Sequence, residues 1–188
     1  MAFDPAAACP ADVLARAARV RLACFDVDGT LTDGRLYFDN LCFDNTPLDG
    51  EGRESKAFHV RDGQGLALLK RAGIAIAFVT ARPGAAAARR AADLGVESHD
   101  RVGDKLAFVR QLAQARGLGM DEVAFMGDDL ADVAVMRAAG FAAAPADAHQ
   151  WALQHAHWHS LARGGAGAAR EFCDLVLAAQ GRLVALLP

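Results

Sequence analysis

Short apolar runs alternate with helical patterns along this sequence, and this alternation limits the fold more than any other feature. The strand-like runs are residues 21–26 (RLACFD), 74–80 (IAIAFVT), 123–127 (VAFMG) and, more weakly, 141–144 (FAAA). Strands separated by helices are joined by right-handed crossovers and form a mostly parallel sheet. We therefore predict an α/β fold, a doubly wound Rossmann-like sheet with helices on both faces.

Five stretches carry apolar residues at helical spacing. They are a pattern that stops near Gly73, one from Pro83 to Gly95, one that places Leu106, Val109, Leu112 and Ala113 on a stripe, one between Asp129 and Gly140, and one with Phe172, Leu175, Val176, Ala179 and Leu183. Gly73 is a typical residue just beyond the end of a helix. These patterns supply the helices that the predicted crossovers need.

Residues 35–58 interrupt the alternation. Phe38-Asp39-Asn40 is followed five positions later by Phe43-Asp44-Asn45, and glycine and proline are frequent around this short duplication. Turn residues flanking short strand-like runs are typical of a β-hairpin. We predict a projecting hairpin or flap here, with an ordinary surface loop as the alternative.

Length and charge restrict the function. The chain has 188 residues, of which 53% are apolar, so we expect a single domain, 1–188, with a flap at 35–58 and a glycine-rich segment and helix at 164–188. A net charge of −3 offers no basic field for nucleic acid. No apolar run is long enough to span a membrane or resembles a signal peptide. The sequence thus predicts a cytoplasmic protein with a small-molecule partner and no nucleic-acid or membrane partner.

Acidic residues follow the first predicted strand, where a parallel sheet places its ligands. Asp26 and Asp28 point the same way because side chains alternate along an extended segment. Two such carboxylates suit Mg²⁺, and one could attack phosphorus while the other transfers a proton. Gly29 allows a sharp turn that lets backbone N–H groups face a phosphate. A solvated acidic turn is the alternative interpretation.

Two further residues sit at the same predicted edge. Thr80 closes the second strand and could donate its hydroxyl to a phosphate oxygen, although a helix N-cap before Pro83 is the alternative. Lys105 begins a helical pattern and could neutralise phosphate and nucleophile together. By itself, Lys105 would be read as a solvated surface lysine.

The third predicted strand ends in Gly127-Asp128-Asp129, with Asp132 one turn further on. Asp128 is placed to complete a metal site with Asp26. Asp129 and Asp132 could hold that site or bind water around it. Acidic residues that complement a helix dipole are the alternative, and both roles are compatible.

Together these residues resemble the four motifs of the haloacid dehalogenase superfamily: Asp26-Val27-Asp28-Gly29-Thr30, then Thr80, then Lys105, then Gly127-Asp128-Asp129. The resemblance implies that Asp26 is the nucleophile and that Asp28 is general acid and then general base. It also implies that Asp26, Asp28 through its backbone carbonyl, and Asp128 hold Mg²⁺. Thr80 and Lys105 would bind the transferring phosphoryl group.

A narrower resemblance adds Thr32-Asp33-Gly34, Val60-Arg61-Asp62-Gly63, Ala146-Asp147-Ala148-His149 and the segment 164–171. These stretches are similar to the family of 3-deoxy-D-manno-octulosonate 8-phosphate phosphatases, which lack a cap domain, form homotetramers and serve lipopolysaccharide synthesis. The resemblance implies a phosphorylated sugar-acid substrate, with Arg61 and Arg82 as candidates for its carboxylate or phosphate. It implies that the segment containing Arg170 reaches a neighbouring active site, with Arg170 as a substrate-binding candidate.

Other functions remain open at this point. Thr30, Ala81 and Ala166 depart from the usual residues of that family, which keeps open a phosphatase of another sugar phosphate, such as a nonulosonate 9-phosphate. A non-catalytic assembly subunit is a third reading. It is opposed by the presence of the complete set of motif residues, which a silent relative would be expected to lose. A phosphotransferase would need a cap to exclude water.

Overall fold

The computed structural model describes residues 4–39 and 53–186, and a six-stranded parallel sheet forms their centre. The strand order is β5-β4-β1-β6-β7-β8, with β1 between β4 and β6. The strands of this sheet are β1 (Leu22–Phe25), β4 (Ala75–Val79), β5 (Glu97–His99), β6 (Val123–Met126), β7 (Phe141–Ala144) and β8 (Trp158–His159). The predicted doubly wound α/β fold is confirmed.

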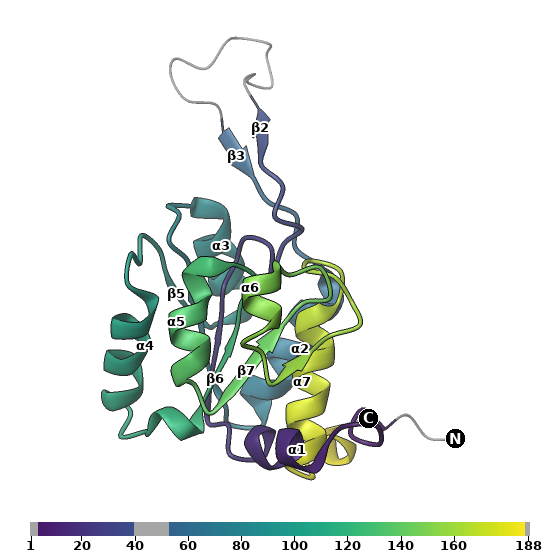
Figure 1. The fold of residues 1–188 in the computed structure, drawn as a ribbon. Helices are drawn as coiled ribbons and strands as arrows, with labels where there is room; N and C mark the ends of the chain where they lie inside the picture. The colour runs from purple at the N-terminus through teal and green to yellow at the C-terminus, as the bar shows by residue number, and fades with distance from the viewer. Residues whose placement is uncertain (1–3, 40–52, 187–188) are drawn as a thin grey trace.

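Helices cover both faces of the sheet (Figure 1). The described α-helices are α1 (Ala11–Ala17), α2 (Val60–Arg71), α3 (Ala85–Leu94), α4 (Lys105–Gln114), α5 (Leu130–Ala138), α6 (Gln150–Leu153) and α7 (Ala168–Ala179). Short 3₁₀ turns, η1 (Met120–Glu122) and η2 (Val184–Leu186), complete the list. None of the helices in the described ranges is long and apolar enough to cross a bilayer.

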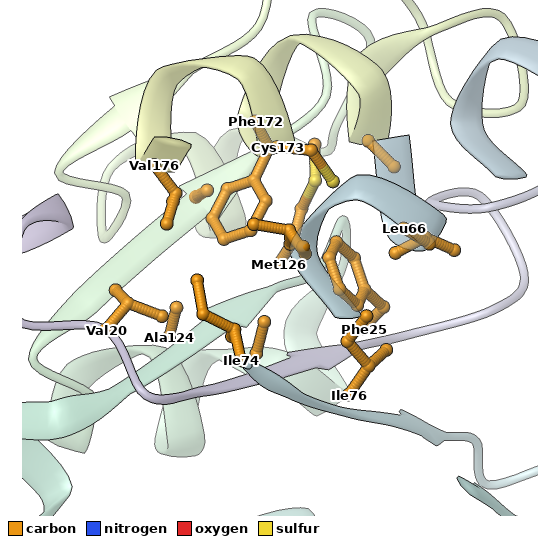
Figure 2. Packing of buried hydrophobic residues seen from close by; sticks show 14 of the residues in the cluster. Val20, Phe25, Leu66, Ile74, Ile76, Ala124, Met126, Phe172, Cys173 and Val176 are labelled. Atoms are coloured by element: carbon orange, nitrogen blue, oxygen red, sulfur yellow. The ribbon is translucent and has the colours of Figure 1, made fainter. Parts of the chain in front are cut away.

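The alternation of side chains along β1 explains why two separate cores form. Ala23 and Phe25 point into one cluster, with residues of α1, α2, α3 and α7. Leu22 and Cys24 point into the other, with residues of α4, α5 and α6. Every residue of β1 is buried, which is the pattern of a strand covered on both faces. The larger core is shown in Figure 2, where Phe25 and Phe172 lie between the sheet and α7.

Differences from the sequence prediction fall at the sheet edges and one helix end. The edge strands β5 and β8 were not predicted, because Glu97-Ser98-His99 and Trp158-His159 are short and partly polar. The last helix was expected to include Leu183, but α7 ends at Ala179. Gly181 adopts a φ of 65°, which turns the chain out of the helix, and Leu183 is buried separately.

The predicted hairpin is confirmed at its base. Strands β2 (Tyr37–Asp39) and β3 (Arg53–Ser55) pair antiparallel and project from the sheet edge, as Figure 1 shows. The second half of the Phe-Asp-Asn duplication lies outside the described residues. Within the described ranges no cap domain is inserted, so this hairpin stands beside an open sheet edge.

Replacing Phe172 by Ala should cost about 3–5 kcal/mol of unfolding free energy, because its ring packs edge-on against Phe25 and stacks on Phe141. Chemical denaturation followed by circular dichroism measures the change. The exposed Val184→Ala variant serves as a control and should stay within about 0.5 kcal/mol of the parent chain. A loss below about 1 kcal/mol in Phe172→Ala would contradict this account of the core.

Candidate active site

The register of the central strands brings three of the predicted loops together. Phe25 of β1 lies beside Phe78 of β4 and Met126 of β6. The residues that follow, Asp26, Thr80 and Asp128, therefore leave the sheet side by side at its carboxyl edge. The structure thus places these three residues at one edge of the sheet, as the sequence predicted.

A tight turn after β1 shapes this edge. The backbone N–H groups of Leu31 and Thr32 both donate to the carbonyl of Val27 at 3.0 Å. Gly29 adopts a φ of 90°, and a Cβ there would lie 2.1 Å from Oδ2 of Asp128. Glycine is required at this position for its conformation and for its close approach to the carboxylate.

Lys105 lies at the centre of the site. Its Nζ donates to Oδ1 of Asp26 and to Oδ1 of Asp132, each at 2.6 Å, and all three side chains are buried. Burial alone lowers the pKa of Lys105, but the two carboxylates outweigh it and the net pKa is raised. Lys105 is thus a charged, buried residue, and the solvated-surface interpretation is wrong.

The start of α5 supplies the remaining acids. Oδ2 of Asp132 accepts the backbone N–H of Asp128 at 3.0 Å and that of Asp129 at 3.3 Å. Thr30 donates its hydroxyl to Oδ1 of Asp128 at 3.1 Å. Asp129 is exposed and caps α5 by accepting the N–H of Leu130 at 2.7 Å. Asp132 therefore fixes Asp128 and Lys105 together, while Asp129 holds the helix terminus.

The donor atoms of this cluster fit a divalent cation. Carboxylate oxygens of Asp26, Asp128 and Asp132 lie within 4.8 Å of one another. Burial, reinforced by the neighbouring carboxylates, raises the pKa of Asp26 to about 6 and that of Asp128 to about 8. Both oxygens of Asp132 already have partners, which leaves Asp26 and Asp128 as the better donors within this cluster. Such closely spaced oxygens are the ligands that Mg²⁺ prefers.

Asp28 has a cation on each side. Lys56 forms an ion pair with its Oδ1, while the hydroxyl of Thr80 lies 3.5 Å and Nε of Arg82 lies 3.9 Å from Oδ2. The sequence analysis missed Lys56. Lys56 lies near the end of the flap segment, where no helical or strand periodicity indicates a role. The one signal in the sequence was the rarity of lysine: the chain has three lysines, and two of them contact Asp26 or Asp28.

The predicted substrate-binding arginines differ in their placement. Arg82 lies beside Asp28 and its side chain is 42% exposed. Arg61 is exposed in the first turn of α2. Arg170 is held by Asp174, with Nε 2.9 Å from both carboxylate oxygens. Of the three, the structure brings Arg82 to the carboxylate cluster.

The glycine-rich segment packs against the loop that follows β1 in its own chain. Gly165 donates its N–H to the carbonyl of Thr30 at 3.1 Å, and a Cβ at Gly164 would lie 1.9 Å from the carbonyl oxygen of Gly29. Buried Asp62 of α2 accepts the N–H groups of Gly167 and Arg170 at 3.3 and 2.8 Å. This part of the chain therefore supports the turn after β1.

The raised pKa values predict a pH-dependent stability of the metal-free protein. Carboxyl groups whose folded-state pKa exceeds the unfolded value stabilise the fold below the unfolded pKa, and this contribution is lost as pH rises through the folded values, here about 6 and about 8. Asp128→Asn should therefore raise the unfolding free energy at pH 9 by on the order of 2 kcal/mol, because each tenfold change in proton affinity corresponds to about 1.4 kcal/mol.

The measurement is urea denaturation in EDTA at pH 4 and pH 9, with exposed Asp121→Asn as the control. At pH 4 the unfolding free energies of the parent chain and Asp128→Asn should differ little. At pH 9 the variant should be clearly more stable than the parent. Added Mg²⁺ should stabilise the parent chain and leave Asp128→Asn unchanged. Equal stability of parent and variant at pH 9 would contradict the repulsion between these carboxylates.

Comparisons with known proteins identify the family to which this chain is related. Residues 99–170 match the model of the haloacid dehalogenase-like hydrolases. The 3-deoxy-D-manno-octulosonate 8-phosphate phosphatase KdsC of Yersinia pestis is 40% identical over 92% of this chain and 87% of its own length.

Solved structures extend the likeness to the fold. A protein from Xanthomonas campestris is 51% identical with a TM-score of 0.89, covering 98% of this chain and 96% of its own. The Moraxella catarrhalis 3-deoxy-D-manno-octulosonate 8-phosphate phosphatase, solved with magnesium, phosphate and KDO, is 34% identical with a TM-score of 0.85, covering 93% and 95%. By sequence and by fold, this chain belongs to the 3-deoxy-D-manno-octulosonate 8-phosphate phosphatase family of haloacid dehalogenase-like hydrolases.

Proposed function

We propose that this chain is a Mg²⁺-dependent phosphatase that hydrolyses 3-deoxy-D-manno-octulosonate 8-phosphate to the free sugar acid and phosphate, a step in lipopolysaccharide synthesis. The observation that carries the proposal is that buried Asp26 and Lys105 lie together with partly buried Asp128 at the open edge of the sheet, beside Asp28. It provides a nucleophile, an acid and a cation-binding cluster in one place. Membership in a family with this activity supports the choice of substrate.

In the first half of the proposed reaction, a carboxylate oxygen of Asp26 attacks phosphorus as the bond from phosphorus to the sugar oxygen breaks. Lys105 holds Asp26 in position and neutralises charge next to it. Asp28 gives its proton to the departing sugar oxygen. Asp26, Asp128 and the carbonyl of Asp28 would hold Mg²⁺, which would supply positive charge to the phosphoryl oxygens.

In the second half, Asp28 takes a proton from a water molecule whose oxygen attacks phosphorus, and Asp26 is released. Thr80 lies next to Asp28 and can donate its hydroxyl to the phosphoryl group. Backbone N–H groups around Gly29 are proposed to do the same, because the chain turns there with a φ of 90° at the end of β1. Asp132 and Asp129 keep the donors in place through the start of α5.

The sugar acid is proposed to lie on the Arg82 side of Asp28. A cavity of about 400 Å³ opens just after Arg82, lined by Pro83, Gly84, Ala85, Ala88, Ser98, Asp100 and Arg101. Its size and mixed polar lining suit a compact, hydroxylated acid. Arg82 is the favoured partner for the substrate's carboxylate, with Arg61 as a second candidate at the rim. Since Arg170 is bound by Asp174, its proposed contact would be with a site on a neighbouring subunit.

We further propose that the chain works as a homotetramer. Six exposed apolar side chains belong to the flap, to segments that begin at the carboxyl edge of the sheet, or to the loop that leaves it: Leu36, Tyr37, Val60, Leu130, Trp151 and Leu161. Apolar side chains grouped around one edge are typical of a surface that a partner covers. Neighbouring subunits would then help to enclose the site.

Phosphate release from a panel of substrates tests the activity. Turnover of octulosonate 8-phosphate should exceed that of nonulosonate 9-phosphates and simple hexose phosphates in kcat/KM by at least about tenfold. EDTA should stop the reaction and Mg²⁺ restore it. Asp26→Asn, which keeps the shape of the side chain, should abolish turnover and serve as the control. Preference for a nonulosonate phosphate would favour that alternative, and no turnover of any ester would favour a non-catalytic subunit.

The assembly is tested by sedimentation at micromolar concentration. The parent chain should sediment as a tetramer, and Trp151→Arg should shift it toward smaller species, because a charge would be buried at the interface. Val184→Ala, at the opposite end of the molecule, should leave the mass unchanged. A parent chain that is monomeric throughout would overturn this part of the proposal.

A further inference from the structure

Lys56 is buried to an unusual degree for a lysine beside a projecting hairpin. Its side chain is only 3% exposed, and its ammonium pairs with Oδ1 of Asp28. Lysines are almost never fully buried unless they are paired, because removing the charge from water is costly. The burial therefore shows that Lys56 occupies a formed site, in contrast to the exposed Lys70 on α2.

The position of Lys56 is defined by elements on both sides. It follows β3 directly. Its Cε lies next to Gly84, the residue before α3: a Cβ built on Gly84 would be 3.5 Å from this Cε, which is van der Waals contact. The lysine thus reaches from the base of the flap across to the loops that follow β1 and β4. Its ammonium stands on one side of Asp28, while Thr80 and Arg82 stand on the other.

The two buried lysines have separate partners. Lys105 contacts Asp26 and Asp132, and Lys56 contacts Asp28. In the proposed reaction these aspartates have different tasks, because Asp26 attacks phosphorus and Asp28 transfers protons. The geometry matches each task with its own ammonium group.

We infer that Lys56 is a positioning residue for the proton-transferring carboxylate, an inference that rests on the proposed phosphatase activity. When the oxygen of Asp26 bonds to phosphorus and the bond to the sugar oxygen breaks, the proton of Asp28 moves to that oxygen and leaves a carboxylate. The ammonium of Lys56 stabilises this new charge and keeps the carboxylate aimed at the reaction centre for the attack by water. Lys56 keeps its own protons throughout.

A different role for Lys56 would be to fasten the flap to the domain. That role predicts a loss of stability, or an equal loss of activity on every phosphate ester. Help with proton transfer predicts a loss that depends on the leaving group. An alkyl oxygen needs a proton to depart, whereas p-nitrophenolate departs well without one.

The experiment compares kcat/KM of the full-length protein, with Mg²⁺, for an alkyl phosphate such as a sugar phosphate and for p-nitrophenyl phosphate, because kcat/KM reports the steps up to cleavage of the ester bond. Lys56→Met should lower kcat/KM on the alkyl ester about 100-fold and on the aryl ester less than about fivefold. Lys56→Arg should recover most of the alkyl activity. Lys70→Met, the matched lysine control, should change neither value. Thermal unfolding of each variant checks that the fold persists.

Equal losses on both esters, or no loss on either, would overturn the role of Lys56 and leave the phosphatase proposal intact. If Lys56→Met fails to fold, Lys56→Gln replaces it, since an amide retains hydrogen-bond donors without the charge, and the same leaving-group dependence is expected. A parent chain that releases phosphate from neither ester would instead overturn the phosphatase proposal, and this inference with it.

Discussion

The buried ammonium of Lys105 is the interaction on which the site depends. It joins Asp26 at the end of β1 to Asp132 in the first turn of α5, and Asp132 in turn fixes the backbone of Asp128. Three carboxylates so close together would repel one another strongly without a cation among them. One lysine offsets part of that repulsion, and the remaining negative charge is what a divalent cation would bind. The carboxylates of the site therefore repel one another in the folded protein, and a bound cation would reduce this repulsion.

The sheet supplies the rigidity that this arrangement needs. β1 is buried on both faces and hydrogen-bonded on both sides, so the residue that follows it has little freedom to move. The flap, by contrast, leaves the sheet edge as a two-stranded hairpin with its base at Lys56. Chemistry on a rigid edge and recognition on a projecting segment is a common division in α/β enzymes.

Sequence reasoning reached the central strands and the meeting of Asp26, Thr80, Lys105 and Asp128, because strand periodicity and the rule for parallel sheets are both local signals. It missed β5 and β8, whose few residues carry too little apolar pattern to be distinguished from loops. It also missed Lys56, since pairing between a flap residue and Asp28 depends on a long-range contact. For Arg170, a motif match suggested a ligand contact, and Asp174, one turn away in α7, holds the side chain within its own chain. The ligand contact stays a prediction.

The contact between Gly164 and Gly29 has a consequence for how this chain can change. Two backbones meet there without intervening side chains, since a methyl group at position 164 would overlap the carbonyl oxygen of Gly29 in the loop after β1. The conformation of the loop after β1 therefore depends on a segment more than a hundred residues later in the chain. At the contact between Gly164 and Gly29, even the methyl group of alanine would force two segments that are distant in the sequence to move apart.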